Sequence, residues 1–324
     1  MTIKELAKAC NVSSSAVSKA LNGYTDINPQ TKNLIIQKAK ELGYIPNHYA
    51  RSLSTKKKNK VAFIVKSSRN KSFIDELTIK YTTSIFKYAH NKLDIIILFD
   101  DIFKERTIDE LIIYLKSLNI GGIILFGINQ NKDEFYSFIN NPDFKTVIID
   151  IPIKDYNTSS IAIDDCTAQY LIAKQVIDTQ TDKHLLYLSG PKDDILAQKR
   201  LQGIQQFSNE NNLNLIVFDC QYQDIIAYNI VLKHHNFDCF ICANDMMAIG
   251  CAKALSKLNI QKKVSGFDGI ALINYIDYPI YTVVQNIEKK SQLAINEMIR
   301  LFNNEESRIV YDTFTISKNK SIYT

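Results

Sequence analysis

From residue 61 to residue 258, short apolar runs alternate with longer segments whose apolar residues repeat with helical spacing. The runs read VAFIV, DIIILF, GGIILFG and TVIIDI in a first set, and SSIAI, HLLYLSG, LIVFD and DCFICA in a second. Helical patterns lie between them at residues 73–90, 104–118, 166–177, 196–209, 225–234 and 245–258. Strands that alternate with helices form parallel sheets, so the pattern predicts two Rossmann-like α/β lobes. The segments 281–285, 287–302 and 310–316 are expected to cross back between these lobes.

Charge sets the first 60 residues apart from this body. Residues 1–60 contain eleven Lys and Arg and three Asp and Glu, whereas the rest of the chain contains 28 and 31. A small basic segment on a mildly acidic body is typical of a nucleic-acid-binding headpiece. On charge alone, a solvated basic tail is an equally good interpretation, and the local pattern has to separate the two.

Composition excludes several other classes of protein. The 324-residue chain has no run of the 18 or so uncharged apolar residues that a membrane span needs. Its start, MTIKELAKAC, is too polar and periodic for a secretion signal. Six scattered cysteines lack the density of a disulfide scaffold, so we expect reduced thiols and no disulfide bonds. These features predict a cytoplasmic protein.

Local signals predict that the basic segment begins with two short helices. Thr2 and Glu5 have the spacing of a capping box ahead of the first helix. Asn11 can adopt a left-handed turn, and Ser13 can cap a second helix over residues 14–21. The expected arrangement is therefore a helix, a tight turn and a second helix.

A third helix is predicted between Pro29 and Gly43. Asn28 is a favoured capping residue, and a proline is tolerated in the first turn because its missing N–H would have no helical partner there. Glycine commonly ends helices. The apolar spacing places Leu34, Ile35, Ala39 and Leu42 on the inner face of this helix.

The stretch TIKELAKACNVSSSAVSKALN, followed by INPQTKNLIIQKAKELGYIPNHYARSL, resembles the helix-turn-helix and hinge of the LacI/GalR family of transcriptional regulators. The resemblance covers the first 53 residues densely and the rest of the chain more loosely. It implies that the second helix lies in the major groove of DNA with Ser14, Ser15 and Lys19 facing base edges. It also implies phosphate contacts from Ser13, Ser18, Asn22, Thr31, Tyr44 and Asn47. Hydroxyl and ammonium groups near a helix N-terminus can donate to bases or phosphates, which agrees with this assignment.

Two headpiece residues depart from the family pattern. Asn11 replaces the usual turn glycine, and asparagine tolerates a positive φ. Lys19 stands where the family most often has arginine, so a point charge replaces the two-pronged grip of a guanidinium on guanine. The serines also have a purely structural alternative, as caps of a core helix.

Residues 46–60 are predicted to form a hinge helix and a linker. The segment PNHYARSL is short and helical in propensity, and the very polar STKKKNK follows it. The resemblance implies that the hinge folds only on DNA, that Ala50 lets two hinge helices approach and that Leu53 inserts between base pairs in the minor groove. Alternatively, Leu53 anchors the linker to the body. The expected domains are a helix-turn-helix unit at 1–45, the hinge at 46–60 and the body at 61–324.

The body resembles the effector-binding part of the same family, which has the type I periplasmic-binding-protein architecture. The phrases that carry this resemblance are LSGP, KRLQG, CANDMMAIG, SGFDG and TVVQ. They imply that Arg200 and Asp268 hold hydroxyls or carboxylates of a ligand, with Asn244 and Gln285 nearby and Phe73 on the first lobe. Open α/β sheets bind ligands at the carboxyl ends of their strands, where Asn244 and Asp268 fall. Arg200 has the alternative role of a salt-bridge partner.

No catalytic, cofactor or metal site is predicted. The phosphate-binding patterns GxGxxG and GxxxxGK[ST] do not occur in this sequence. Cys239 and Cys242 have the spacing of half a zinc site, but they lie in an apolar run, which favours buried thiols. The resemblance therefore implies a homodimeric operator-binding repressor that is controlled by a small molecule, a sugar or a derivative of one. The rival classes are a solute-binding protein, which would need an export signal, and a nucleotide-using enzyme.

Overall fold

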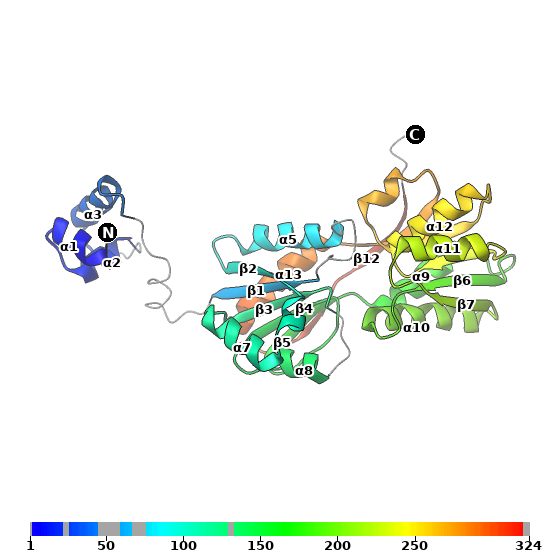
Figure 1. The fold of residues 1–324 in the computed structure, drawn as a ribbon, viewed down its shortest axis with the longest axis horizontal. Coiled ribbons are helices and arrows are strands. Elements are labelled where there is room, and N and C mark those ends of the chain that lie inside the picture. The colour runs from blue at the N-terminus through cyan, green and yellow to red at the C-terminus, as the bar shows by residue number, and fades with distance from the viewer. Residues whose placement is uncertain (1, 22–25, 45–58, 67–75, 129–132, 320–324) are drawn as a thin grey trace. The chain divides into compact units, whose positions relative to one another are not determined.

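The computed structural model describes residues 2–21, 26–44, 59–66, 76–128 and 133–319. It divides the chain into two compact units, Met1–Lys57 and Lys58–Thr324, shown in Figure 1. We call the first unit the headpiece and the second the body. The expected combination of a helical headpiece with a two-lobed α/β body is confirmed.

The headpiece contains three short helices around one small core. They are α1 (Ile3–Ala9), α2 (Ser14–Leu21) and α3 (Pro29–Glu41). Each begins at its predicted capping residue: Thr2 forms a capping box with Glu5, Ser13 accepts from the Ala16 amide, and Asn28 accepts from the Gln30 amide. The core consists of Leu6, Ala7, Cys10, Val17, Ala20, Ile35 and Ala39.

One part of the headpiece prediction is wrong. Leu34 and Leu42 were expected on the inner face of α3, but they are 46% and 41% exposed. Ile35 and Ala39 are the residues of α3 that are buried in the core. The short helices α1 and α2 cover only this narrow part of its surface. Asn11 has a φ of 53°, so the left-handed turn between α1 and α2 forms as predicted.

Lobe 1 of the body is a six-stranded parallel sheet covered by helices on both faces. Its strands, in spatial order, are β11 (Ile309–Tyr311), β5 (Thr158–Ala162), β4 (Lys145–Ile149), β3 (Gly122–Phe126), β1 (Lys60–Val65) and β2 (Asp94–Phe99). Its helices are α5 (Glu76–Ala89), α6 (Ile102–Glu105), α7 (Ile108–Ser117), α8 (Asp133–Ile139) and α13 (Ile287–Phe302). Successive residues of β1 point to opposite faces: Phe63 packs into the core under α5 and α13, and Ile64 into the core under α7 and α8.

Lobe 2 repeats this plan with one antiparallel edge strand. Its strands, in spatial order, are β12 (Phe314–Lys318), β10 (Ile280–Gln285), β9 (Lys263–Asp268), β8 (Cys239–Cys242), β6 (His184–Ser189) and β7 (Asn214–Asp219). Its helices are α9 (Asp165–Val176), α10 (Ile195–Glu210), α11 (Asp224–Lys233), α12 (Asp245–Lys257) and the 3₁₀ helix η1 (Ala271–Tyr275). β12 pairs antiparallel with β10, and the other neighbours in the sheet are parallel.

The chain passes between the lobes three times. It leaves lobe 1 after β5, returns from β10 to α13, and leaves again from β11 to β12. Figure 1 shows α13 (orange) beside α5 in lobe 1, although their sequences are about 200 residues apart. The expected crossing of the last segments is therefore confirmed, with residues 310–316 divided between the two sheets.

Three details differ from the sequence prediction. The segment SSIAI was grouped with the second set of strands, but β5 belongs to the sheet of lobe 1. The helix expected over 104–118 is two helices, because Thr107 caps α7 in a capping box with Glu110. The short helix α8 was not predicted.

The structure also bears on the expected buried thiols and on the expected lack of a membrane span. Cys239 and Cys242 are buried in β8, as the apolar run indicated, and all six cysteines are free thiols. Within the described part of the chain, no helix is long and apolar enough to cross a membrane.

Candidate DNA-binding face and interlobe site

In the headpiece, α2 presents its polar side chains on the side away from the core. Val17 and Ala20 are buried against α1 and α3, whereas Ser15 is exposed and Ser14 is half-buried. Ser13 caps the helix, since its Oγ accepts from the Ala16 amide at 3.1 Å. Its hydroxyl hydrogen still allows it to donate to another group, so the capping role and a phosphate contact are compatible.

Lys19 is held by a partner that the sequence interpretation did not consider. Its Nζ donates to Oδ2 of Asp26 at 2.6 Å, and the two side chains are 43% and 59% exposed. Asp26 follows the described end of α2 by five residues and precedes α3. The hydrogen bond from Lys19 lowers the pKa of Asp26, so the carboxyl is ionised at neutral pH. The pair places a donor and an acceptor side by side on the exposed side of α2.

The other candidate DNA contacts divide into two groups. Ser18 on α2, Thr31 on α3 and Tyr44 just after α3 are half-buried, and the Tyr44 amide donates to the Ala39 carbonyl at 2.8 Å. The remaining candidates lie outside the described residues: Asn22, Asn47, Ala50 and Leu53. The hinge prediction therefore stays a prediction.

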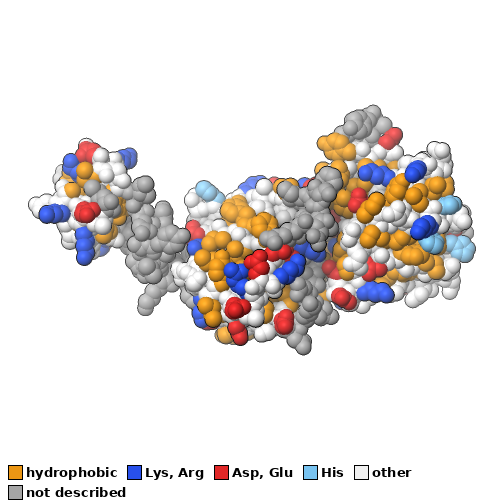
Figure 2. Space-filling view, in the orientation of Figure 1, with side chains coloured by type: hydrophobic (Ala, Val, Ile, Leu, Met, Phe, Trp, Pro, Cys, Tyr) orange, Lys and Arg blue, Asp and Glu red, His pale blue; other side chains and the backbone are white. Residues whose placement is uncertain are grey.

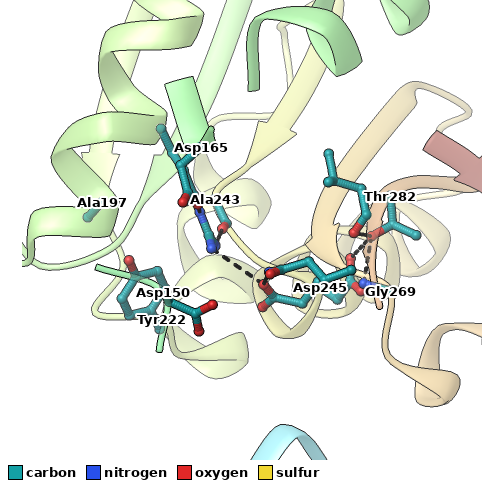
Figure 3. Close-up of polar contacts among 12 residues, drawn as sticks. Asp150, Asp165, Ala197, Tyr222, Ala243, Asp245, Gly269 and Thr282 are labelled. Carbon is teal, nitrogen blue, oxygen red and sulfur yellow. Dashed lines mark hydrogen bonds and ion pairs between the residues drawn. The ribbon is translucent and has the colours of Figure 1, made fainter. Parts of the chain in front are cut away.

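In the body, Arg200 of α10 is the centre of a buried ion cluster, and its side chain is only 6% exposed. Its Nε donates to Oδ1 of Asp165 and its Nη1 to the carbonyl oxygen of Ala243, both at 2.7 Å. Figure 3 shows Asp165 and Ala243 close together at this point. Its Nη2 lies 3.5 Å from Oδ1 of Asp268, and its guanidinium lies over the ring of Phe267. Arg200 is therefore an ion-pair partner of Asp165 and Asp268, and its role in holding a ligand stays a prediction.

The cluster continues from Asp268 into lobe 1 through an amide side chain. Gln285, at the end of β10, donates from Nε2 to Oδ1 of Asp268 at 3.1 Å. Its Oε1 accepts from Nζ of Lys290 at 2.7 Å. Lys290 lies on α13, has no exposed side-chain area and forms an ion pair with Asp150 at the end of β4. Three residues of the predicted effector site, Arg200, Asp268 and Gln285, are thus brought together.

The backbone at both ends of this chain of contacts is unusual. Asp150 has a φ of 80° and Asp268 has a φ of 111°, values that residues other than glycine seldom adopt. Such conformations cost on the order of 1–3 kcal/mol each and cluster where side chains must be aimed at a ligand. Here, one such residue ends a central strand of each lobe, and both carboxylates belong to the same polar network.

Asn244 lies at the start of α12, and its predicted contact with a ligand stays a prediction. Its Oδ1 accepts from the Met247 amide at 2.9 Å, so it caps α12. The next residue, Asp245, is buried and accepts from Thr282 Oγ1 at 2.7 Å and from the Ile270 amide at 2.9 Å. Figure 3 shows Asp245 directed toward Thr282 and Gly269. These bonds hold in place the turn that directly follows Asp268, the last residue of β9.

Burial and neighbouring charges shift the pKa values of the ionisable groups in this cluster. Burial raises the pKa of Asp165, and the positive charge of Arg200 lowers it in part, with a net increase. Burial tends to lower the pKa of Arg200, but Asp165 and Asp268 raise it above its ordinary value, so the guanidinium stays charged. Burial and the charge of Asp268 raise the pKa of Asp245 well above the usual range. The permanent cation of Arg200 therefore lies beside the carboxyl groups of Asp165 and Asp268, which pair with it.

Some of these residues were missed by sequence reasoning. Asp150 follows an apolar run and Lys290 lies in a helical pattern, and neither position carries a recognisable motif. Asp165 stands beside Asp164 in the sequence and likewise carries no recognisable motif. Asp150 could have been found because it directly follows β4, and open α/β sheets bind ligands at the carboxyl ends of their strands. Phe73 lies outside the described residues.

A helix-turn-helix headpiece joined to a two-lobed body with a polar network between the lobes defines the class of DNA-binding transcriptional regulators. Residues 2–47 match the model of the bacterial regulatory proteins of the lacI family. Residues 2–47 therefore form a DNA-binding domain of the lacI type, and the chain is a DNA-binding transcriptional regulator.

Similar proteins agree with this assignment over almost the whole chain. The HTH-type transcriptional regulator MalR of Clostridium butyricum is 24% identical over 98% of this chain and 98% of its own. A crystal structure of the lac repressor dimer bound to operator and the anti-inducer ONPF superposes with a TM-score of 0.83 at 16% identity, over 99% and 98% of the two chains. A periplasmic solute-binding protein of Actinobacillus succinogenes with bound D-allose has a TM-score of 0.64 at 18% identity, over 79% and 96%. The expected periplasmic-binding-protein-like fold of the body is confirmed.

Proposed function

We propose that this regulator is a homodimeric repressor that binds operator DNA through α2 and changes its DNA affinity when a small polyhydroxylated molecule binds between the lobes. Because its partner is DNA, we propose that it acts in the cytoplasm. We propose no catalytic activity. The observation that carries the proposal is the polar network that joins Asp268 of lobe 2 to Asp150 of lobe 1 through Gln285 and Lys290. A ligand that bonds to any of these groups must alter the contact between the lobes.

Support for a polyhydroxylated effector comes from the mixture of donors and acceptors. Arg200 supplies donors, Asp268 supplies acceptors and Gln285 supplies both. A hydroxyl group can donate to a carboxylate and accept from a guanidinium or an amide at the same time, so a sugar fits such a set. Asn244 completes the set when its amide nitrogen faces the ligand while its Oδ1 caps α12. The relatives include a ribose operon repressor, which is named for the operon of a sugar.

Support for the dimer comes from exposed apolar side chains on lobe 1. Ile79 and Phe86 of α5 are 47% and 43% exposed, and Phe99 at the end of β2 is 54% exposed. In the view of Figure 2, hydrophobic side chains (orange) gather on the visible face of lobe 1. Large apolar side chains that lie together on a surface commonly mark a protein interface. We assign this part of lobe 1 to the contact between two copies of the chain.

Selection from a random duplex DNA library with the purified full-length protein tests the DNA-binding function. We expect an enriched near-palindrome, because each copy of α2 in a symmetric dimer reads one half-site. Failure to enrich any sequence at low salt would contradict the proposal. For the effector, thermal shift and DNA-release assays with neutral mono- and disaccharides should identify a sugar that both stabilises the protein and changes its affinity for the selected DNA.

A further inference from the structure

We propose that Lys19 and Asp26 read one G·C base pair together, which makes Asp26 a specificity-determining residue. This inference rests on the proposed binding of α2 in the major groove. Lys19 alone would be a single flexible ammonium with little preference among the acceptors of a groove. The structure places the Asp26 carboxylate 2.6 Å from that ammonium, and both side chains remain largely accessible to a ligand.

The chemistry of base edges favours G·C for such a pair. In the major groove, a G·C pair presents two neighbouring acceptors, N7 and O6 of guanine, followed by one donor, N4 of cytosine. An ammonium that faces the two acceptors and a carboxylate that faces the donor match all three groups. An A·T pair presents a donor between two acceptors, so a neighbouring ammonium and carboxylate would leave one acceptor without a partner. The pair also fixes the orientation, with guanine on the side of Lys19.

Asp26 should also weaken binding to DNA of arbitrary sequence. A carboxylate near the phosphate backbone is repelled by it, and its pairing with Lys19 keeps that ammonium from neutralising a phosphate. Where no correctly oriented G·C pair is present, the carboxylate finds no donor on the DNA, and its repulsion by the phosphates remains. The same residue thus raises affinity for one base pair and lowers it for all others.

Library selection with the wild-type protein and with Asp26→Asn tests this role. The wild type should select a motif with one strongly preferred G·C pair in each half-site. In Asp26→Asn, the preference at that position should fall about tenfold, a change of the size expected from the loss of one base contact. Affinity for random-sequence DNA should rise at the same time, because Lys19 is then available to phosphates.

Glu41→Gln is the matched control. Glu41 is an exposed carboxylate of α3 that pairs with Lys38 at 2.8 Å, so its replacement changes the charge of the headpiece by the same amount. This variant should select the wild-type motif at full strength. If Asp26→Asn also selects that motif with unchanged preference at every position, or if Glu41→Gln relaxes it equally, Asp26 has no role in reading bases. A wild-type protein that selects no motif at all would instead contradict the proposed function itself.

Discussion

Glu76 and Ala271 join the two lobes by a direct hydrogen bond. The Glu76 carboxylate, at the start of α5 in lobe 1, accepts from the Ala271 amide of lobe 2 at 2.8 Å, and its second oxygen accepts from the Leu272 amide at 3.3 Å. Leu77 packs beside this contact on an apolar cluster of lobe 2 that contains Ile270. Charge and apolar packing therefore hold the lobes together at the same place.

Removal of the Glu76 charge should loosen this contact. In Glu76→Gln, only one oxygen remains to accept, and the charge-assisted bonds become neutral ones, which are about half as strong. Hydrogen exchange of the peptide that contains Ala271 and Leu272 should therefore become faster, while the core strands exchange at unchanged rates. Glu288→Gln is the control, because Glu288 is an exposed carboxylate whose contacts with Lys87 and Tyr88 lie within lobe 1. Equal exchange in Glu76→Gln and wild type would show that the carboxylate does not hold the lobes.

Acid should loosen the same contact. Burial tends to raise the pKa of Glu76, but the Ala271 amide and Lys80 outweigh it, so the pKa lies below its ordinary value of about 4.5. A lowered pKa means that the contact contributes its full stability above the ordinary value and loses it as the pH falls through the lowered one. Protection of the Ala271 and Leu272 amides, corrected for intrinsic exchange rates, should decrease in that range. In Glu76→Gln this decrease should be absent.

Loss of the Arg200 cation should destabilise the body. Arg200→Met leaves Asp165 and Asp268 buried without their cation, and breaking a buried ion pair in this way costs about 3–5 kcal/mol. Urea unfolding should show this loss in the free energy of unfolding. The double variant Arg200→Met with Asp165→Asn should recover part of it. If the single and double variants are equally unstable, the lost packing over Phe267 outweighs the electrostatic contribution.

Asp268 should affect the ligand response without affecting DNA binding. Asn is the appropriate substitution, because the φ of 111° at this position strains most side chains and Asn tolerates positive φ. Asp268→Asn should keep the wild-type DNA affinity and lose most of the DNA release caused by an effector sugar, since a charge-assisted bond worth about 1.5–3 kcal/mol is removed. Normal release by this variant would remove Asp268 from the effector site.

DNA affinity should depend steeply on salt. Residues 1–60 carry eight more positive than negative side chains, and each phosphate that they neutralise releases a counterion. Affinity should fall by orders of magnitude between about 50 and 200 mM salt, measured by fluorescence anisotropy with the selected DNA. A flat response would contradict DNA binding by the headpiece.

Local sequence signals predicted the headpiece well where capping decides the structure. Thr2, Ser13 and Asn28 each interact with residues two or three positions away, so a short stretch of sequence contains both partners. The burial of Leu34 and Leu42 could not be predicted in the same way. Burial depends on which helices pack nearby, and the apolar spacing of α3 fits more than one inner face.

In the body, two signals predicted the lobe 2 side of the interlobe network. One is the rule that ligands bind at the carboxyl ends of parallel strands, and the other is the family resemblance. Asp268 and Gln285 end neighbouring strands, and the structure places them in contact. Asp150 and Lys290 are 140 residues apart, and a lysine in an amphipathic helix ordinarily belongs to the solvent face. Only the return of the chain to lobe 1 through α13 brings the two together. Sequence spacing carries no information about such a contact.

That return has a consequence for synthesis on the ribosome. Residues 165–285 supply every strand of lobe 2 except β12, so most of that sheet can form as soon as they emerge. Lobe 1 is begun first but finished late: Ile295, Met298 and Leu301 of α13 fill its core beside Phe63. The growing chain must therefore leave one face of the first sheet covered by α5 alone while residues 165–285 of the second lobe are translated. In a cell, this unfinished lobe is the part of the nascent protein most in need of a chaperone.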